Sequence, residues 1–308
     1  MRDAFSSYNP IINLIHFASA MLFSMFFMHP VCLALSFLCA FAYYAYLNGK
    51  KALRTGGLFM LPMLLVTALV NPAFNHEGVT ILLYLRDGNP LTLESIVYGI
   101  AAALMLISIV SWFGCCGKVM TSDKLVYLFG GLIPALSLVL SMALRFVPRF
   151  KSQIKVISDA QKCVGRDVSN GNVLLRARHG IRIVSIMVTW ALENAIETAD
   201  SMKCRGYGLP GRTAFSVFRF DRRDFMALLF MLACDAYIVA GALAGGLYFR
   251  YFPSVAGVWG GLRTTGLFAV CFALYAMPVA INLREDAKWK ALEAKIQPRA
   301  AQSSVQRF

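Results

Sequence analysis

The sequence predicts an all-α integral membrane protein, a polytopic helical bundle that carries a cytosolic domain of amphipathic helices. Hydrophobic residues make up 58% of the 308 residues and charged residues only 15%. The mean hydropathy of +0.61 is far above that of a soluble domain. Half of the 30 Lys and Arg residues lie between Arg145 and Arg223, flanked by apolar runs. Such a basic block is typical of a segment that stays in the cytosol.

Seven apolar runs are long enough to be considered as membrane spans. They cover residues 11–28, 31–47, 57–71, 94–113, 127–145, 225–249 and 254–281. Only His29 and Pro30 separate the first two runs, which predicts a tight helical hairpin. The last two runs predict a hairpin that crosses the membrane outward and returns.

Basic residues orient these runs. Three of them lie in the loop 48–54, which places this loop and the N-terminus in the cytosol, and six follow Asn282, which places the tail there too. The segment 72–93 carries one Arg against two acidic residues and is expected outside. The predicted localisation is the cell membrane, multi-pass, with both termini cytoplasmic.

The number of runs before the basic block conflicts with this orientation. Five runs precede the block, whereas a cytosolic N-terminus and a cytosolic block require an even number of crossings. One run therefore does not cross simply. The weakest are 57–71, which is short and contains a proline, and 127–145, which contains two glycines and a proline and could be broken or oblique. The stretch 81–85 could also re-enter the membrane, and the sequence leaves these alternatives open.

These boundaries predict four parts. They are N-terminal transmembrane helices over 1–144, a cytosolic domain over 145–224, a C-terminal transmembrane hairpin over 225–281 and a cytosolic tail over 282–308.

Two amphipathic helices are predicted inside the cytosolic domain. From Arg149 to Val164, apolar residues recur at helical spacing opposite three lysines. A second helix carries an apolar stripe from Leu192 to Met202 and stops at Gly206. The apolar run 181–192 is too short to span, so we expect it to pack inside the domain or to lie in the membrane interface. The two helices are either surface helices with solvated charges, or each presents an Arg to a partner.

The glycines after the second helix imitate a nucleotide-binding loop. Gly206, Gly208 and Gly211 spell GxGxxG, and the same stretch approaches a Walker A loop with Arg212 in place of the lysine. Both motifs need a preceding strand, but here a helix precedes and Pro210 removes a backbone donor. We therefore interpret the stretch as a turn.

The sequence shows no motif for catalysis or metal binding. No HExxH, GxSxG or acidic metal-binding repeat occurs, the eight cysteines include no CxxC pair, and the four histidines are scattered. We predict no catalytic residue, no metal site and no cofactor. The net charge of +14 is explained by cytosolic loops, so nucleic acid is not an expected partner.

Asp235 lies inside the long apolar run 225–249. A charge at the bilayer centre costs about 2.5–3.5 kcal/mol on insertion scales, so Asp235 either pairs with a neighbouring helix or lines a polar path. In the same run Gly241 and Gly245 have the GxxxG spacing that suits close helix packing.

Several segments resemble the transmembrane T component of energy-coupling factor (ECF) transporters, the EcfT/CbiQ-like family. The resemblance covers most of the chain and is strongest over 141–225. It rests on Asn9-Pro10, Leu144-Arg145-Phe146-Val147-Pro148, Ala160-Gln161, Glu193-Asn194-Ala195-Ile196-Glu197, Met202 to Gly208, Arg212-Thr213 and Phe218 to Asp224.

The resemblance implies two cytosolic coupling helices, each ending in a short motif whose Arg docks into a groove on an ATPase subunit. In the second motif Arg205 matches the Arg, with Cys204 where Ala is usual and Gly206 after it. In the first, Val164 stands at the Arg position, and Gly165-Arg166 follows. Either Arg166 takes over the role or this helix docks differently.

The function implied is that of a non-catalytic scaffold subunit of an ECF-type ABC importer. The expected partners are two cytosolic ATPase subunits, a small substrate-binding membrane subunit and the lipid bilayer. The cargo would be a vitamin or a metal ion such as cobalt or nickel, bound by the other membrane subunit. The alternative is a self-sufficient secondary transporter that uses Asp235; a membrane enzyme is disfavoured because no catalytic constellation occurs.

Overall fold

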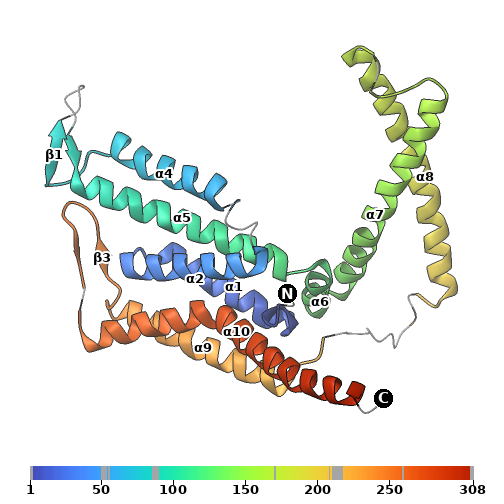
Figure 1. Cartoon of the computed structure of the whole chain (residues 1–308). Helices are drawn as coiled ribbons and strands as arrows, with labels where there is room; N and C mark the ends of the chain where they lie inside the picture. The colour runs from blue at the N-terminus through green and yellow to red at the C-terminus, as the bar shows by residue number, and fades with distance from the viewer. Residues whose placement is uncertain are drawn as a thin grey trace. The chain divides into compact units, whose positions relative to one another are not determined.

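The computed structural model describes residues 3–49, 54, 56–84, 90–169, 171–207, 209, 218–258 and 260–305 (Figure 1). The predicted all-α membrane class is confirmed. Helices dominate these residues, and strands occur there only as two short antiparallel pairs. The chain forms two compact units, one of residues 1–121 with 218–308 and the other of residues 122–217.

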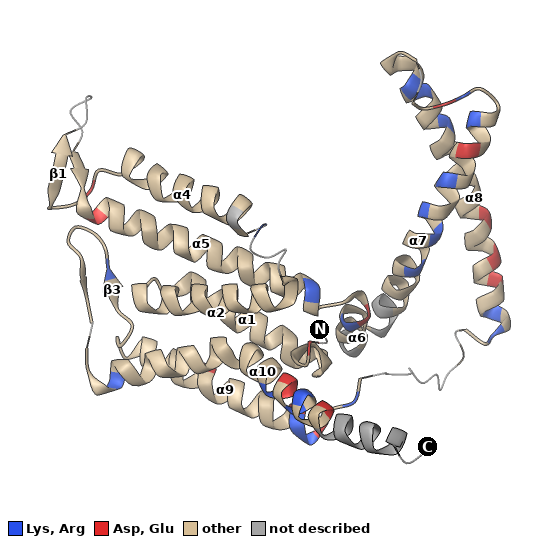
Figure 2. Ribbon diagram, viewed as in Figure 1, with Lys and Arg blue, Asp and Glu red and all other residues tan. Residues whose placement is uncertain are grey.

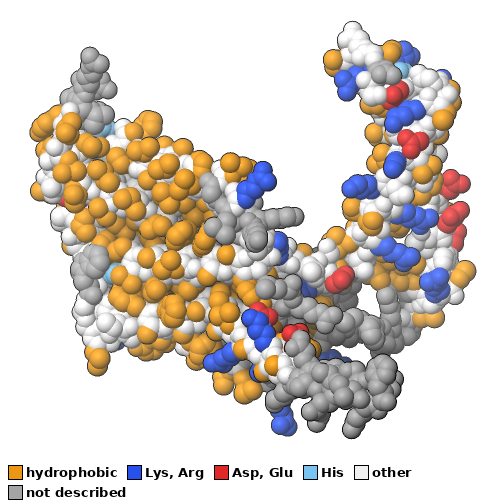
Figure 3. Space-filling model, in the orientation of Figure 1, with side chains coloured by type: hydrophobic (Ala, Val, Ile, Leu, Met, Phe, Trp, Pro, Cys, Tyr) orange, Lys and Arg blue, Asp and Glu red, His pale blue; other side chains and the backbone are white. Residues whose placement is uncertain are grey.

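The first unit, which we call the bundle unit, is built from six long helices. They are α1 (Pro10–Phe26), α2 (Pro30–Asn48), α4 (Leu61–Phe74), α5 (Leu93–Val119), α9 (Arg222–Leu243) and α10 (Leu262–Val305). A π-helical turn, Gly56–Met60, precedes α4. Figure 3 shows that apolar side chains cover the visible face of this unit, as expected for a surface in contact with lipid.

Four of the described helices are long and apolar enough to cross a membrane. They are Pro30–Asn48, Leu93–Val119, Arg222–Leu243 and Leu262–Ala294. Two shorter apolar helices, Pro10–Phe26 and Leu58–Phe74, accompany them. Together these six helices correspond to six of the seven runs in the sequence.

The seventh run, 127–145, is divided between two helices of the other unit. Helix α6 (Ser122–Leu132) ends before Ile133, whose extended backbone (φ −138°, ψ 93°) breaks the chain direction, and α7 (Pro134–Cys163) starts at the following proline. Proline suits the first turn of a helix because its missing N–H has no partner there in any case. The run is therefore broken, and four apolar runs remain before the basic block.

The hairpin of α1 and α2 follows from its capping residues. The Asn9 side chain accepts a hydrogen bond from the Ile11 amide (3.1 Å) at the start of α1, and His29 Nδ1 accepts one from the Val31 amide (3.3 Å) at the start of α2. Each cap is followed by proline, at Pro10 and Pro30. The tight turn predicted at His29-Pro30 is confirmed.

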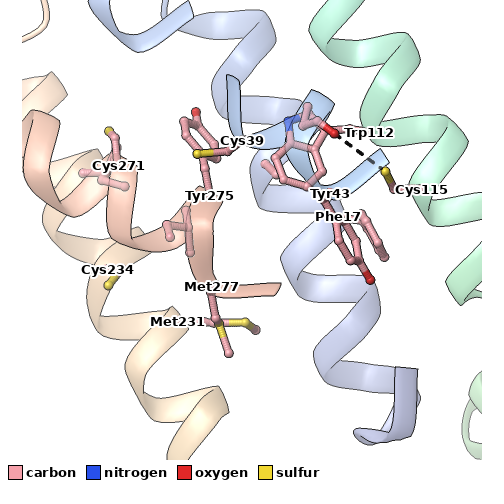
Figure 4. Packing of buried hydrophobic residues seen from close by; sticks show 14 of the residues in the cluster. Phe17, Cys39, Tyr43, Trp112, Cys115, Met231, Cys234, Cys271, Tyr275 and Met277 are labelled. Carbon is pink, nitrogen blue, oxygen red and sulfur yellow. Dashed lines mark hydrogen bonds between the residues drawn. The ribbon is translucent and has the colours of Figure 1, made fainter. Parts of the chain in front are cut away.

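The core of the bundle unit combines aromatic rings with Cys and Met side chains (Figure 4). Phe17 and Tyr43 stack with ring centres 6.4 Å apart, and Trp112 of α5 meets Phe17 edge-on at 6.3 Å. The indole N–H of Trp112 donates to the Ser36 hydroxyl (3.0 Å), which satisfies a buried donor. These contacts join α1, α2 and α5, while Tyr275 brings α10 to the same cluster at 6.2 Å from Trp112.

Helices α9 and α10 approach closely at a glycine. A Cβ placed on Gly241 would overlap the Leu267 side chain, so only glycine fits there without a shift. The predicted partner in the GxxxG pattern is wrong: α9 ends at Leu243, and Gly245 lies beyond it with a positive φ of 78° and open space around it. Gly246 takes its place, since a Cβ there would lie 2.7 Å from Leu267.

Two strand pairs lie at one end of the bundle unit. They are β1 (Ile81–Tyr84) with β2 (Pro90–Thr92), and β3 (Phe249–Arg250) with β4 (Ala256–Gly257). The Val79 amide donates to the Pro253 carbonyl (3.2 Å) and links the two loops. The stretch 81–84, considered above as a re-entrant segment, is an exposed strand, and residue 85 lies outside the described residues.

A polar strap ties residues 3–9 to the rest of the bundle unit. The Asn282 side chain of α10 accepts from the amides of Ala4 (2.7 Å) and Phe5 (3.2 Å) and donates to Asp3 (2.6 Å). The Tyr43 hydroxyl of α2 donates to the other carboxylate oxygen of Asp3 (2.9 Å). These bonds satisfy buried groups at the point where three segments meet.

The second unit, which we call the coupling unit, contains α6, α7 and α8 (Val173–Cys204). Both predicted amphipathic helices are confirmed, because α7 continues through 149–163 and α8 reaches Cys204. In the run 181–192, Ile183 and Met187 are buried against Ile157 of α7. This face of the run packs inside the unit, which was one of the two arrangements expected from the sequence.

Candidate functional site

The end of α8 is a glycine-stopped tip that presents Arg205. Cys204 is the last helical residue, Arg205 is the C-cap, and Gly206 follows with a positive φ of 79°. The Tyr207 amide donates to the Met202 carbonyl (3.0 Å) and the Gly206 amide to the Lys203 carbonyl (3.0 Å). This pair of bonds defines a Schellman motif, which requires the left-handed conformation that glycine adopts most readily.

The end of α7 repeats this geometry. Cys163 is the last helical residue, Val164 is the C-cap, and Gly165 has a positive φ of 75°. The Arg166 amide donates to the Gln161 carbonyl (2.9 Å) and the Gly165 amide to the Lys162 carbonyl (2.9 Å). The two tips therefore share one backbone motif, in which Val164 corresponds to Arg205 and Arg166 to Tyr207.

This correspondence explains why the first motif looks irregular in sequence. At the α8 tip the arginine stands before the glycine, whereas at the α7 tip Val164 stands there and Arg166 follows the glycine. The structure thus brings Gly165 and Arg166 together at one tip and Cys204, Arg205 and Gly206 at the other.

The charges around the two tips are arranged alike. Lys162 lies 3.5 Å from Asp159, and Lys203 lies 3.7 Å from Asp200, each pair one helical turn apart. Within the described part of the chain neither Arg166 nor Arg205 pairs with a carboxylate. The lysines are therefore engaged locally, while the guanidinium groups remain available to a partner.

The loop after the α7 tip is braced by its own side chains. The Ser169 hydroxyl and amide donate to the Asp167 carboxylate, and these bonds lower the pKa of Asp167 below its usual value. Arg176 Nε donates to the Val168 carbonyl (2.8 Å) and ties the loop to the start of α8. Arg166 is thus followed by an ordered turn.

The two helices cross in antiparallel fashion between the tips. Ile157, Ile183 and Met187 form the buried contact, and the rings of Phe150 and Trp190 meet at 5.8 Å. Beyond the crossing α8 continues to Cys204, and basic and acidic residues occur along both helices (Figure 2). The tips therefore lie at opposite ends of the crossed pair.

The apolar stripe of α8 is only partly covered. Five residues recur at intervals of three or four and are 52–70% exposed: Ile181, Val184, Val188, Leu192 and Ile196. Contiguous exposed apolar surface of this kind marks an interaction surface. This face of the run 181–192 is largely exposed, in contrast to the face that carries the buried Ile183 and Met187.

Asp235 stands alone in α9. Its Oδ1 atom is buried and has no hydrogen-bond partner, and no described cationic group lies within ion-pair distance. The pairing with a neighbouring helix that the sequence suggested is therefore not formed among the described residues.

The α8 tip explains part of the glycine pattern that resembles a nucleotide-binding loop. Gly206 serves as the stop of a helix, and the element that precedes it is α8, not a strand. Gly208, Pro210, Gly211, Arg212 and Thr213 lie outside the described residues. Among the residues that are described, no three His, Cys, Asp or Glu side chains gather as a metal site would require.

Comparison with known proteins gives no matching family model. The chain is similar to curated proteins named energy-coupling factor transporter transmembrane protein EcfT. It is 33% identical over 101 residues to the Lactobacillus helveticus protein (32% of this chain, 36% of the relative) and 35% identical over 108 residues to that of Lacticaseibacillus paracasei (35% and 41%). It is also 34% identical over 104 residues to that of Streptococcus thermophilus (33% and 39%).

These similarities confirm the resemblance to an ECF transporter T component. They cover about a third of the chain, less than the sequence reading expected, and 36–41% of the three relatives.

Proposed function

We propose that this chain is the transmembrane scaffold of an ECF-type ABC importer. In this role it couples ATP hydrolysis by two cytosolic ATPase subunits to uptake of a vitamin or a metal ion through a small substrate-binding membrane subunit. The observation that carries the proposal is the pair of Schellman-stopped tips, each with an arginine beside the glycine. The similarity to EcfT proteins over about a third of the chain adds support.

Arg205 is suited to dock in an acidic or carbonyl-lined groove. A guanidinium group offers five N–H donors in a planar fork and forms strong charge-assisted bonds with carboxylates. The Schellman motif fixes the backbone of Arg205 with two hydrogen bonds, so a displacement of the tip is passed to α8 as a whole. A rigid lever of this kind is what coupling between an ATPase and a membrane unit requires.

Arg166 forms a second and different dock. It follows the glycine of its tip, whereas Arg205 precedes the glycine. Its guanidinium group therefore starts from another backbone position relative to the helix end. We propose that the two ATPase subunits contact the two tips in unequal ways.

The exposed apolar stripe of α8, from Ile181 to Ile196, is the proposed contact for the substrate-binding membrane subunit or the bilayer interface. Burial of apolar side chains of this size stabilises an interface by about 25 cal/mol per Å². The Arg205 tip and the stripe both lie on α8, so this one helix would connect an ATPase subunit to the second partner.

The proposed topology keeps residues 145–223 and the tail after Asn282 in the cytosol. The charge distribution supports it, and so does the break of the run 127–145 at Ile133, which leaves four apolar runs before the coupling helices. ATP hydrolysis is assigned to the partner subunits, so this chain would carry no catalytic site.

A self-sufficient secondary transporter is the second candidate, because the buried Oδ1 of Asp235 has no partner among the described residues. Such a transporter would work without ATPases.

Purification of the tagged full chain from its native membrane separates the two candidates. We expect two ATPases and a small hydrophobic protein to accompany the chain in stoichiometric amounts. Substrate uptake into vesicles that contain this chain alone, driven by an ion gradient, would replace the proposal with the second candidate.

A further inference from the structure

A groove lies within the coupling unit between the first half of α7 and the end of α8. Its α7 wall is a single stripe, because Leu138, Met142, Arg145 and Arg149 are spaced by four, three and four residues and share one helix face. The stripe is apolar over its first turns and cationic over the next. The groove encloses about 940 Å³, which is at the upper end of the range for ligand sites.

The opposite wall comes from the last turns of α8 and the tip that follows them. It is lined by Asn194, Glu197, Thr198, Ser201, Met202, Arg205, Gly206 and Tyr207. The contact of Phe150 with Trp190 sets the register of the antiparallel pair, so the arginines lie toward the crossing of the helices. Leu138 and Met142 lie farther from this crossing, toward the start of α7.

The two arginines of the stripe form no ion pair with the carboxylates that the structure describes. The Arg149 guanidinium group lies over the Trp190 ring, 5.5 Å from its centre. This cation–π contact holds the group near the crossing of α7 and α8. Among the described residues neither Arg145 nor Arg149 lies within ion-pair distance of a carboxylate, Glu197 included. Two like charges one turn apart repel each other. An anion bound between them is attracted to both and offsets that repulsion.

The shape of the groove adds an apolar requirement to the anionic one. Leu138, Met142 and Phe146 of α7 line the groove, and so does Met202 of α8, so the groove offers apolar surface beside its arginines. α6, which leads into α7, starts at Ser122, three residues after the candidate span Leu93–Val119 ends. A ligand that is anionic at one end and apolar at the other, and that is abundant beside a membrane span, is a phospholipid.

We propose that this groove binds an anionic phospholipid. Its phosphate lies on Arg145 and Arg149, and one acyl chain runs along Met142 and Leu138. Arginine suits this role because its planar fork pairs with phosphate oxygens in bidentate fashion. The bound lipid would fill the space between the diverging halves of α7 and α8. This site goes beyond the proposed transport role, although Arg205 and Gly206 of the α8 tip also line the groove.

Native mass spectrometry of the purified full chain in detergent tests the site. The probes are phosphatidylglycerol, which is anionic, and phosphatidylcholine, which carries the same phosphate without net charge. We expect the chain to retain phosphatidylglycerol, and the double variant Arg145→Gln/Arg149→Gln to bind it about tenfold more weakly or worse, since two charge-assisted contacts are lost.

The matched control is Arg178→Gln/Arg182→Gln. It removes two exposed arginines at the same spacing from α8, outside the groove, and should retain the lipid. Equal loss in both double variants, or equal retention of both lipids by the unaltered chain, would overturn the proposal. Melting temperatures of the variants, measured without lipid, identify a loss that reflects unfolding.

A second arm distinguishes a lipid from a soluble phosphate. Inorganic phosphate and the chain-free headgroup glycerophosphoglycerol should fail to displace phosphatidylglycerol at millimolar concentration. Met142→Asp should weaken binding of the long-chain lipid, because it places a charge on the acyl path. Displacement by inorganic phosphate, or binding unaffected by Met142→Asp, would overturn the lipid assignment.

Discussion

The guanidinium group of Arg223 lies over the ring of Tyr8, 4.2 Å from its centre. Arg223 also donates to the Ser7 carbonyl (3.5 Å), so the first turn of α9 is held against the segment before α1. Its neighbour Asp224 is buried and completes a capping box with Asp221. Residues 218–221 lead into α9, and Arg223 anchors the first turn of this helix to the segment before α1.

We expect Tyr8→Leu to lower the free energy of unfolding by about 0.5–2 kcal/mol, the range of a cation–π contact. Arg223→Gln should have a similar effect, and the double variant should lose less than the sum, because both changes remove the same contact. Melting temperatures in detergent measure this cycle, with Arg222→Gln as the control. Strictly additive losses would show that the two side chains do not interact.

Arg205→Ala should abolish uptake or release an ATPase. A charge-assisted contact in a desolvated groove is lost, at a cost of about 2–5 kcal/mol. Arg205→Lys should also impair transport, because lysine lacks the planar fork. ATPase co-purification and uptake at matched membrane expression measure the effect, with Arg178→Ala as the control. Normal uptake by Arg205→Ala would remove the coupling assignment.

Arg166→Ala should reduce uptake measurably but less than Arg205→Ala. Lys162 lies one turn earlier at the same tip and can replace the positive charge once it leaves Asp159. The same two assays apply, together with the double variant. A larger defect from Arg166→Ala would keep the coupling role and reverse the ranking of the two tips.

The isolated chain should neither hydrolyse ATP nor bind it. The glycines after Arg205 follow a helix in place of a strand, and Arg212 stands where a Walker A loop has lysine. Calorimetric titration of the purified chain with ATP checks this. Micromolar binding that disappears on Arg212→Ala would show that the loop is a nucleotide site.

Single cysteines in a cysteine-free background should report the proposed topology. Cysteines at Lys151, Arg176 and Lys290 should resist an impermeant thiol reagent in intact cells, whereas one at the exposed Glu77 should react. All four should react once the membrane is opened. Reaction at Arg176 from outside would invert the arrangement of the coupling unit.

Gly241→Ala should destabilise the bundle unit by about 1 kcal/mol or more, because the added methyl group displaces Leu267. Gly117→Ala in α5 is the matched control, since nothing lies within 4 Å of its Cβ position. The control should be neutral or more stable by about 0.5–1 kcal/mol, as glycine weakens a helix interior. Equal melting temperatures for the two variants would contradict the close approach.

The sequence predicted helices where capping residues and periodicity agree. Asn9-Pro10 and His29-Pro30 mark the starts of α1 and α2, and Gly206 marks the end of α8. It could not decide how the run 127–145 behaves, because hydropathy does not register the backbone break at Ile133. It identified Gly241 at the close contact but paired it with Gly245, because spacing alone does not reveal that α9 ends at Leu243.

Local sequence patterns could not predict two features: the equivalence of the two tips and the groove between the helices. The tip motif depends on a positive φ at Gly165 that makes Val164 and Arg205 correspond. The stripe of Leu138, Met142, Arg145 and Arg149 was visible as a helical spacing, yet its meaning depends on the register that Trp190 sets from α8. Contacts between residues far apart in sequence decide both features.

The hydrogen bonds from Asn282 to Ala4 and Phe5 join residues 278 and 277 positions apart, and this separation sets an order of assembly. During synthesis the segment 3–9 emerges first, but its partner exists only when α10 has been made. The coupling unit has its helix contacts within residues 122–217 and can form in the interval. A nascent chain that stops before α10 lacks both the Asn282 side chain of the strap and the Tyr275 ring beside Trp112. The strap can therefore close only after α10 has been made.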